Sequence, residues 1–147
     1  MVIRKADAQD EWAVRACAED AYQQYVVAIG KKPAPMVADF GAQIAEGCVY
    51  VACRGNEVVG FIVFFERDDH MFLENVAVKT ALARQGIGKA LIDYCEIQTK
   101  ALGLTSVVLY TNEKMTANLS MYPHLGYVEF DRRAEAGFNR VYFKKSV

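Results

Sequence analysis

Two closely spaced glycines, Gly86 and Gly88, lie between the cationic residues Arg84 and Lys89. Because glycine has no side chain, its backbone N–H can approach an anion closely, and nearby cations strengthen the attraction. An apolar run, Val76–Val78, precedes this segment, and a helix-like pattern follows it. The N–H groups at the start of a helix attract the same kind of ligand, so these residues together support phosphate or pyrophosphate binding.

Two common phosphate-binding motifs do not match this segment. A dinucleotide-binding Gly-x-Gly-x-x-Gly fingerprint requires a third glycine where the chain has Leu91, so a nicotinamide-dependent oxidoreductase is disfavoured. A P-loop would need glycine at Ala83 and Ser or Thr at Ala90. The remaining interpretations are a pyrophosphate cradle and a tight turn that only begins a structural helix.

The periodicity of the apolar residues predicts the elements around the glycines. Residues 71–78 (MFLENVAV) predict a strand, and Ile87, Leu91 and Cys95 share one stripe of the helix that follows. Residues 106–111 (SVVLYT) predict the next strand. A strand, a helix and a strand in this order form a crossover, so we expect the two strands to be parallel.

The first part of the chain predicts a strand, two helices and a hairpin. Residues 2–4 form a short strand, and the segment 7–30 is helical, with an aspartate at its start as N-cap. A second helix is expected over residues 35–47, where apolar residues recur at four-residue spacing. Residues 48–65 predict a β-hairpin that turns at the Gly55–Asn56 pair, with strands that are apolar on both faces.

The last part of the chain predicts a helix over residues 115–125 and two further strands, 127–132 and 140–145, joined by a loop over 133–139. The chain shows no internal repeat and no low-complexity stretch. We therefore expect residues 1–147 to form a single domain of the mixed α/β (α+β) class.

Composition and charge disfavour several classes of function. With 147 residues, 53% of them hydrophobic, the chain can bury one core. The net charge is −1 and the pI is about 6.1, so no basic stripe indicates nucleic-acid binding. No signal peptide is evident, and no apolar run reaches the roughly 20 residues that a membrane span needs. We expect a cytoplasmic protein that binds a small ligand and no membrane.

Cysteine and histidine residues give no indication of a metal or redox centre. The four cysteines lie far apart in the sequence and form no Cys-x-x-Cys pair, so we expect reduced and mostly buried thiols. A catalytic cysteine would need a histidine partner, and the candidates are His70 and His124. These are expected in a polar turn and near a helix end, and no metal is expected.

The longer stretches ENVAVKTALARQGIGKALIDYCE and LYTNEKMTANLSMYPHLGY resemble the GNAT superfamily of acetyl-CoA-dependent N-acetyltransferases. The resemblance runs across nearly the whole chain and is strongest over residues 58–127. It implies a mostly antiparallel central sheet of six or seven strands, helices on both faces, and a parallel pair of strands at the cofactor cleft. It also implies an enzyme that transfers the acetyl group of acetyl-CoA to a primary amine by direct attack in a ternary complex, without a metal.

The resemblance also implies the residues of the cofactor site. In the family a Q/R-x-x-G-x-G/A loop binds the coenzyme A pyrophosphate, and its first position falls on Ala83 here. The strand before the loop hydrogen-bonds the pantetheine arm through its main chain. The family's usual asparagine in a later helix is Met115 here, and Asn118 is the expected substitute. The implied cofactor-binding residues are Val76, Ala77, Val78, Arg84, Gln85, Gly86, Ile87, Gly88, Lys89, Asn118 and Tyr122.

The reaction needs a base and an acid, because the amine must lose a proton and the departing thiolate must gain one. Glu74 is the candidate base, directly or through a water, because strand alternation places this carboxylate on the same face as Val76. Tyr122 matches the family's tyrosine and is the candidate acid, and the N–H of Val78 is the candidate oxyanion donor. The structural alternatives are an ion pair for Glu74 and a core anchor for Tyr122.

The sequence leaves the acceptor and the oligomeric state open. The segment 22–40 is expected to border the acceptor pocket, with Tyr22, Tyr25 and Phe40 as possible walls. These residues do not distinguish a small-molecule amine from a peptide, and a homodimer is a possible assembly. The alternative function is a sensor domain that binds acetyl-CoA or coenzyme A and catalyses nothing.

Overall fold

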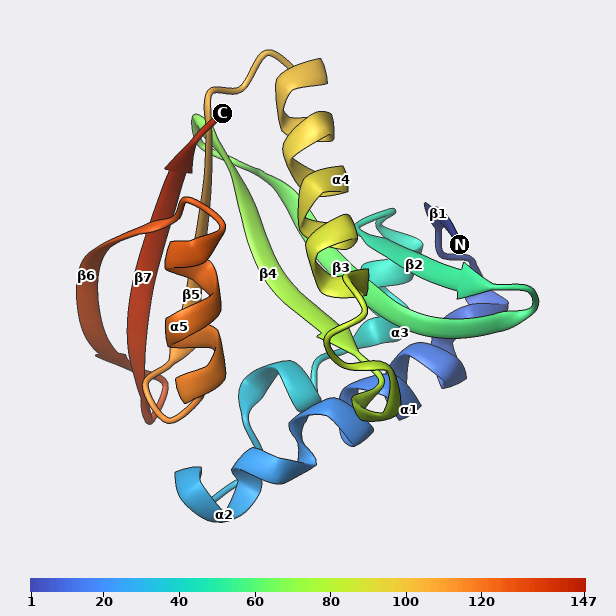
Figure 1. The fold of residues 1–147 in the computed structure, drawn as a ribbon, viewed down its shortest axis with the longest axis horizontal. Helices are drawn as coiled ribbons and strands as arrows, with labels where there is room; N and C mark the ends of the chain where they lie inside the picture. Colours follow the sequence, from blue (N-terminus) through green and yellow to red (C-terminus); the bar gives the residue numbers. More distant parts are fainter.

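The computed structural model describes residues 1–147, and its centre is one seven-stranded sheet (Figure 1). The strand order is β1-β2-β3-β4-β5-β7-β6, and all neighbours are antiparallel except β4 and β5. The predicted mixed, mostly antiparallel sheet with one parallel pair is therefore confirmed. The strands are β1 (Val2–Lys5), β2 (Val49–Arg54), β3 (Glu57–Arg67), β4 (His70–Val78), β5 (Ser106–Asn112), β6 (Val128–Glu135) and β7 (Phe138–Ser146).

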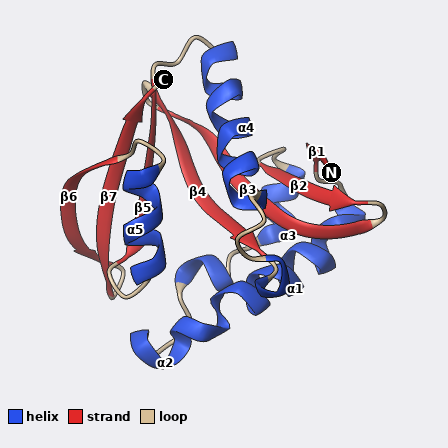
Figure 2. Ribbon diagram, in the orientation of Figure 1, coloured by secondary structure: helices blue, strands red, loops and turns tan.

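Helices cover both faces of the sheet. In Figure 2, α4 and α5 cross the near face, while α1 and α3 pack with a second cluster of core residues on the opposite face. None of the helices combines the length and the hydropathy needed to cross a membrane. The helices are α1 (Glu11–Tyr22), α2 (Val26–Ile29), α3 (Phe40–Ala45), α4 (Ile87–Ala101) and α5 (Thr116–His124).

The crossover β4–α4–β5 packs closely because β3 carries a glycine beneath α4. A Cβ at Gly60 would lie 2.9 Å from the Ala77 carbonyl oxygen and 3.3 Å from side-chain atoms of Ile87 and Leu91. No larger residue fits there without moving the helix or the strand. Gly60 thus allows the first turns of α4, which follow the glycine loop, to lie directly on β3 and β4.

The predicted hairpin at Gly55 and Asn56 is confirmed, because Arg54 pairs with Glu57 across a two-residue turn. Gly55 has a φ of +59°, which lies in the left-handed region that favours glycine. The four cysteines are free thiols, and all except Cys48 are buried.

The second helix begins later than the sequence indicates. The prediction over residues 35–47 is wrong for its first turn, since Ala34–Met36 forms only a short 3-10 turn and α3 starts at Phe40. The Asp39 side chain accepts a hydrogen bond of 3.0 Å from the Ala42 N–H and caps the true start. Phe40 is fully buried and packs edge-to-face on Phe61, so it belongs to the core and does not line an acceptor pocket.

The last two strands extend through the segment that the sequence assigns to a loop. Of residues 133–139, only Ala136 and Gly137 form the turn, and Glu135 pairs with Phe138. The prediction fails because β6 is an edge strand whose polar side chains face solvent, so it lacks the apolar alternation of a half-buried strand.

The parallel pair β4 and β5 is short and then separates. The two strands pair only over Met71–Leu73 and Val107–Leu109, and beyond these residues they diverge (Figure 1). β4 also carries a bulge: Val63 of β3 pairs with Asn75 and Phe64 with Leu73, so Glu74 has no partner. The divergence and the bulge together shape the site described next.

Candidate active site

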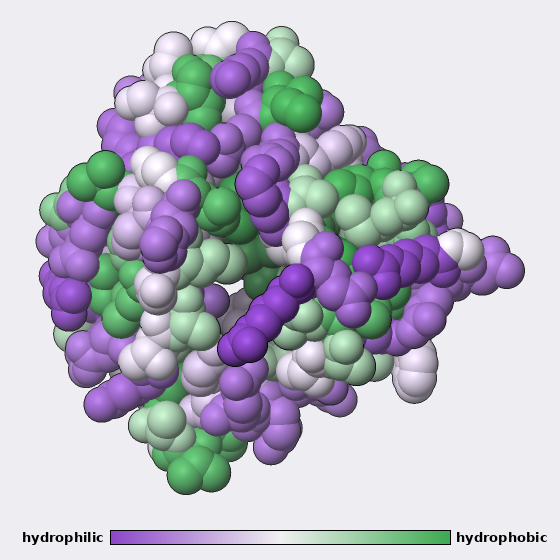
Figure 3. Space-filling view, in the orientation of Figure 1, coloured by the Kyte–Doolittle hydropathy of each residue, from purple (hydrophilic) through white to green (hydrophobic).

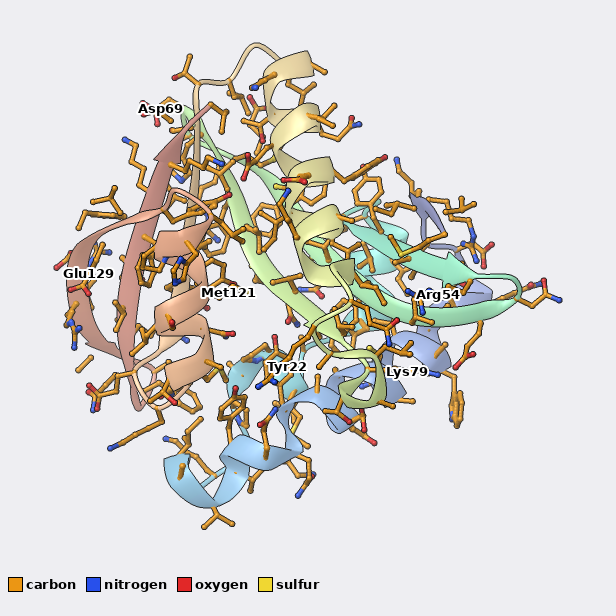
Figure 4. The ribbon with its side chains drawn as sticks, in the orientation of Figure 1. Tyr22, Arg54, Asp69, Lys79, Met121 and Glu129 are labelled. Atoms are coloured by element: carbon orange, nitrogen blue, oxygen red, sulfur yellow. The ribbon has the colours of Figure 1, made fainter.

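The gap between β4 and β5 opens into two pockets that meet, because Tyr22, Val76 and Asn118 line both of them. Figure 3 shows the molecule hollowed at this position, and Figure 4 places Tyr22 and Met121 at its borders. The pocket that we call the loop pocket is lined by Ala21, Tyr22, Gln24, Tyr25, Val76, Ala77, Val78, Thr80, Leu82, Ala83, Arg84, Gly86, Ile87, Gly88, Lys89, Ile92, Asn118 and Met121. The pocket that we call the strand pocket is lined by Tyr22, Pro33, Ala34, Pro35, Leu73, Glu74, Asn75, Val76, Tyr110, Thr111, Asn112, Met115, Asn118, Tyr122, Phe138 and Arg140.

The glycine loop presents free backbone N–H groups to the loop pocket. Gly86 adopts a φ of +82° as the N-cap of α4, and the first helical hydrogen bond runs from the Ala90 N–H to the Gly86 carbonyl at 3.0 Å. The N–H groups of Ile87, Gly88 and Lys89 therefore have no acceptor within the helix. Together with the positive end of the α4 dipole, they form a site for an anion.

Gly88 is not required by the fold. A Cβ there would meet only the Val78 side chain, at an ordinary contact distance of 3.6 Å. The missing side chain instead leaves the N–H groups at the start of α4 accessible from the loop pocket. This separates Gly88 from Gly86, whose left-handed conformation itself favours glycine.

The charged and polar side chains of the loop point in different directions. Arg84 is exposed and makes no hydrogen bond or ion pair within the protein, so its guanidinium is available to a ligand. The Lys89 ammonium lies 2.8 Å from an Asp93 carboxylate oxygen. The side chain of Gln85 turns away from the pocket and accepts a hydrogen bond of 2.9 Å from Arg54.

The main chain of β4 continues the loop pocket. The Lys79 N–H donates to the Val59 carbonyl at 3.0 Å, so in the antiparallel ladder the N–H groups of alternate residues point toward β3. The N–H groups of Val76 and Val78 point the other way, into the gap where β5 has already separated. The Tyr22 hydroxyl donates to the Val76 carbonyl at 3.0 Å and lies 2.7 Å from the Asn75 side-chain oxygen.

Tyr122 of α5 faces the strand pocket from a buried position. Its ring centroid lies 5.8 Å from that of Tyr127 and 5.6 Å from that of Phe143, while its hydroxyl has no hydrogen-bond partner in the protein. Burial raises the pKa of Tyr122, so the phenol keeps its proton at neutral pH. Asn118, one turn earlier, donates to the Thr111 hydroxyl at 3.2 Å.

A sequence profile of the Acetyltransferase (GNAT) family matches residues 12–127. The chain belongs to this family. Of the loop residues and the tyrosine that the resemblance to this family indicates, all except Gln85 line the two pockets at the β4–β5 gap.

A curated relative of this GNAT chain agrees with the family assignment. The N-acetyltransferase YvbK of Bacillus subtilis (strain 168), itself described as uncharacterized, is 29% identical over 85 residues, which cover 57% of this chain and 55% of that protein. The match thus spans about half the length of this curated relative.

Solved structures of GNAT proteins share the fold. The PaiA N-acetyltransferase from Thermoplasma acidophilum, in complex with coenzyme A, superposes with a TM-score of 0.79 at 16% identity and covers 99% of this chain and 98% of its own. The ribosomal-protein-S18-alanine N-acetyltransferase from Escherichia coli gives a TM-score of 0.73 at 15% identity, over 99% and 93% of the two chains. At these identities the likeness concerns the fold alone.

Glu74 lies on the opposite face of the sheet from the one predicted. Strand alternation placed it with Val76, but the bulge leaves Glu74 and Asn75 together on the face that α1 and α3 cover. The side chain of Val76 packs with the other cluster of core residues. The Glu74 carboxylate accepts a hydrogen bond from the Gln43 amide and lines the strand pocket beside Tyr110.

Among the residues of the strand pocket that were not identified from the sequence are Asn75 and Arg140. Asn75 is buried and donates to the Pro35 carbonyl at 2.9 Å, and a polar residue within an apolar strand was the available signal. Arg140 enters from β7, and no local pattern marks it. Of the expected acceptor walls, Tyr22 lines both pockets and Tyr25 lines only the loop pocket.

Proposed function

We propose that this protein transfers the acetyl group of acetyl-CoA to a primary amine by direct attack in a ternary complex. The observation that carries the proposal is that the loop pocket and the strand pocket meet at Tyr22, Val76 and Asn118. A donor bound in one pocket and an acceptor bound in the other would have their reacting atoms at this junction, which converts a bimolecular encounter into a positioned reaction.

The loop pocket offers groups that suit the pyrophosphate and the pantetheine arm of coenzyme A. The free N–H groups of Ile87, Gly88 and Lys89 and the unpaired Arg84 guanidinium suit a pyrophosphate. The Val76 N–H, which points into the gap, suits an amide carbonyl of the pantetheine arm, which would extend toward the junction. Ala77 continues this strand, and Gln85 contributes its main chain only, since its side chain bonds Arg54.

Three groups of the chain serve the chemistry. Acetyl-CoA would supply an activated thioester carbonyl: the amine nitrogen forms the N–C bond, and the C–S bond to coenzyme A then breaks. Glu74 accepts the proton of the amine, directly or through one water, and the N–H of Val78 stabilises negative charge on the carbonyl oxygen. The Tyr122 hydroxyl donates its proton to the departing thiolate, giving N-acetylated amine and coenzyme A.

Two measurements test the proposal. Acetyl-CoA at about 100 times its dissociation constant should stabilise the fold by about 2.7 kcal/mol in thermal melts. With acetyl-CoA and a panel of primary amines, thiol release should depend on the amine and match the amount of acetylated product. Stabilisation without thiol release from any amine would favour the sensor function instead, and stabilisation by NADH or ATP but not acetyl-CoA would refute the cofactor assignment.

A further inference from the structure

The strand pocket contains one acid and one base that are not paired with each other. Glu74 of β4 and Arg140 of β7 are its two charged lining residues. No ion pair joins them: the Glu74 carboxylate accepts from the Gln43 amide, and Arg140 has only a long contact of 3.9 Å with Glu135. Two opposite charges that face one cavity without neutralising each other suit a ligand that carries both charges.

Arg140 has unused capacity for hydrogen bonding. Its side chain is only 14% exposed, and none of its N–H groups donates a hydrogen bond within the protein. The Glu135 carboxylate nearby already accepts from the Tyr142 hydroxyl. A guanidinium has five N–H donors, and leaving them unpaired in a largely desolvated position is costly.

Aromatic packing holds the Arg140 guanidinium in the wall of the pocket. It lies 4.2 Å from the ring centroid of Tyr110, which also lines the strand pocket. A second cation, Lys31, lies 4.3 Å from the ring centroid of Phe138, another lining residue. Lys31 itself does not line the pocket, so Arg140 is the one positive lining residue and Glu74 the one negative lining residue.

We propose that the amine acceptor carries a carboxylate and that Arg140 binds it, as in an amino acid. The carboxylate of the acceptor would take the forked, bidentate geometry that a guanidinium favours, and its amine would lie toward Glu74 and the junction with the loop pocket. This inference rests on the proposed function, because it names the class of acceptor for the same site. Arg140 determines acceptor specificity and takes no part in the proton transfers.

The test compares α- and ω-amino acids with their methyl esters as acceptors, in the wild-type protein and in two variants. Arg140→Gln removes the charge and keeps most of the side chain. Arg133→Gln is the matched control, because Arg133 also lies over an aromatic ring, that of Tyr142 at 4.4 Å, but does not line the pocket. The ratio of kcat/KM for acid and ester is compared between proteins, which cancels the intrinsic reactivity of the amines.

We expect the wild-type protein and Arg133→Gln to prefer the free acids. In Arg140→Gln the ratio of kcat/KM should fall by about 10- to 100-fold, mainly through KM, which is the range for a lost charged hydrogen bond. An Arg140→Lys variant should keep part of the preference, since it retains the charge and loses the fork. The wild-type preference requires no variant to fold, so it tests the inference independently.

Two negative results are distinguishable. If wild-type protein acetylates amines without a carboxylate as efficiently as amino acids, and Arg140→Gln does the same, the inference is wrong and the proposed function stands. If no amine in the panel is acetylated, the proposed function fails and the inference fails with it.

Discussion

Replacing Tyr122 by Phe separates catalysis from packing, because the structure predicts opposite effects on the two. The ring packs on Tyr127 and Phe143, and Phe preserves these contacts. The hydroxyl has no hydrogen-bond partner in the protein, so its removal leaves no buried group unsatisfied. We expect the free energy of unfolding to change by no more than about 0.5 kcal/mol.

Turnover should respond very differently. If the Tyr122 hydroxyl protonates the departing thiolate, kcat should fall by about 10² to 10⁴, with acetyl-CoA affinity nearly unchanged. This corresponds to about 2.7–5.4 kcal/mol of barrier. Burial raises the pKa of Tyr122, so the acid stays protonated through the neutral range and its loss should lower the rate at all pH values there.

Tyr127→Phe is the matched control for this experiment. The Tyr127 hydroxyl donates to the Glu96 carboxylate at 3.0 Å, and its ring is as deeply buried as that of Tyr122. Its removal should lower the free energy of unfolding by about 1.5–3 kcal/mol, the range for hydrogen bonds to charged groups, and leave kcat unchanged.

The assay follows thiol release under saturating acetyl-CoA and urea unfolding monitored by fluorescence. A donor with a more acidic thiol should reduce the defect of Tyr122→Phe, because a better leaving group needs less help from an acid. The reasoning is refuted if Tyr122→Phe turns over within a factor of about three of the wild type, which is less than about 1 kcal/mol of barrier.

Three further predictions concern the base, the glycines and pH-dependent stability. Glu74→Gln should lower kcat by about 10² and flatten the ascending limb of the pH–rate profile, and wild-type rates across this limb would exclude Glu74 as the base. Gly88→Ala should leave the melting temperature of the free protein nearly unchanged and reduce the stabilisation by acetyl-CoA. Gly60→Ala should instead destabilise the fold by about 1–3 kcal/mol, because its Cβ would lie 2.9 Å from the β4 backbone. Equal shifts of the melting temperature in the two variants would contradict this prediction. The Arg4 guanidinium donates to Asp10 and holds the pKa of that carboxyl below its ordinary value, so the pair stabilises the fold at neutral pH and the stabilisation is lost as the pH falls through the lowered pKa. Because Arg4 is partly exposed, Asp10→Asn should lower the free energy of unfolding in urea by only about 1 kcal/mol at neutral pH. If the difference in this free energy between the variant and the wild type does not shrink in acid, the ion pair is not its cause.

Features that depend on neighbours along the chain were predicted correctly. The turn at Gly55 and Asn56, the crossover from β4 through α4 to β5, and the end of α2 at Gly30 all follow from turn residues and apolar periodicity. These signals act within a few residues, so the sequence carries them without knowledge of the fold.

Three features that depend on contacts between residues far apart in the sequence were not predicted. Strand alternation assigned Glu74 to the wrong face, because the bulge that shifts it forms only against Val63 and Phe64 of β3. The segment 133–139 was assigned to a loop, because it lacks the apolar alternation of a strand. Most of it is nevertheless in strands, because β6 and β7 pair with each other there. Phe40 was a possible wall of the acceptor pocket and lies in the core, where it packs on Phe61.

The sequence by itself determined the glycine loop at Gly86 and Gly88 and the family to which the chain belongs, because both reside in contiguous residues with characteristic spacing. Only the tertiary structure decided which side chains meet at the gap between β4 and β5. Tyr22 from α1, Asn118 from α5 and Arg140 from β7 converge there although they lie far apart in the sequence. Their convergence depends on the separation of two parallel strands and on long-range packing, which no local pattern encodes.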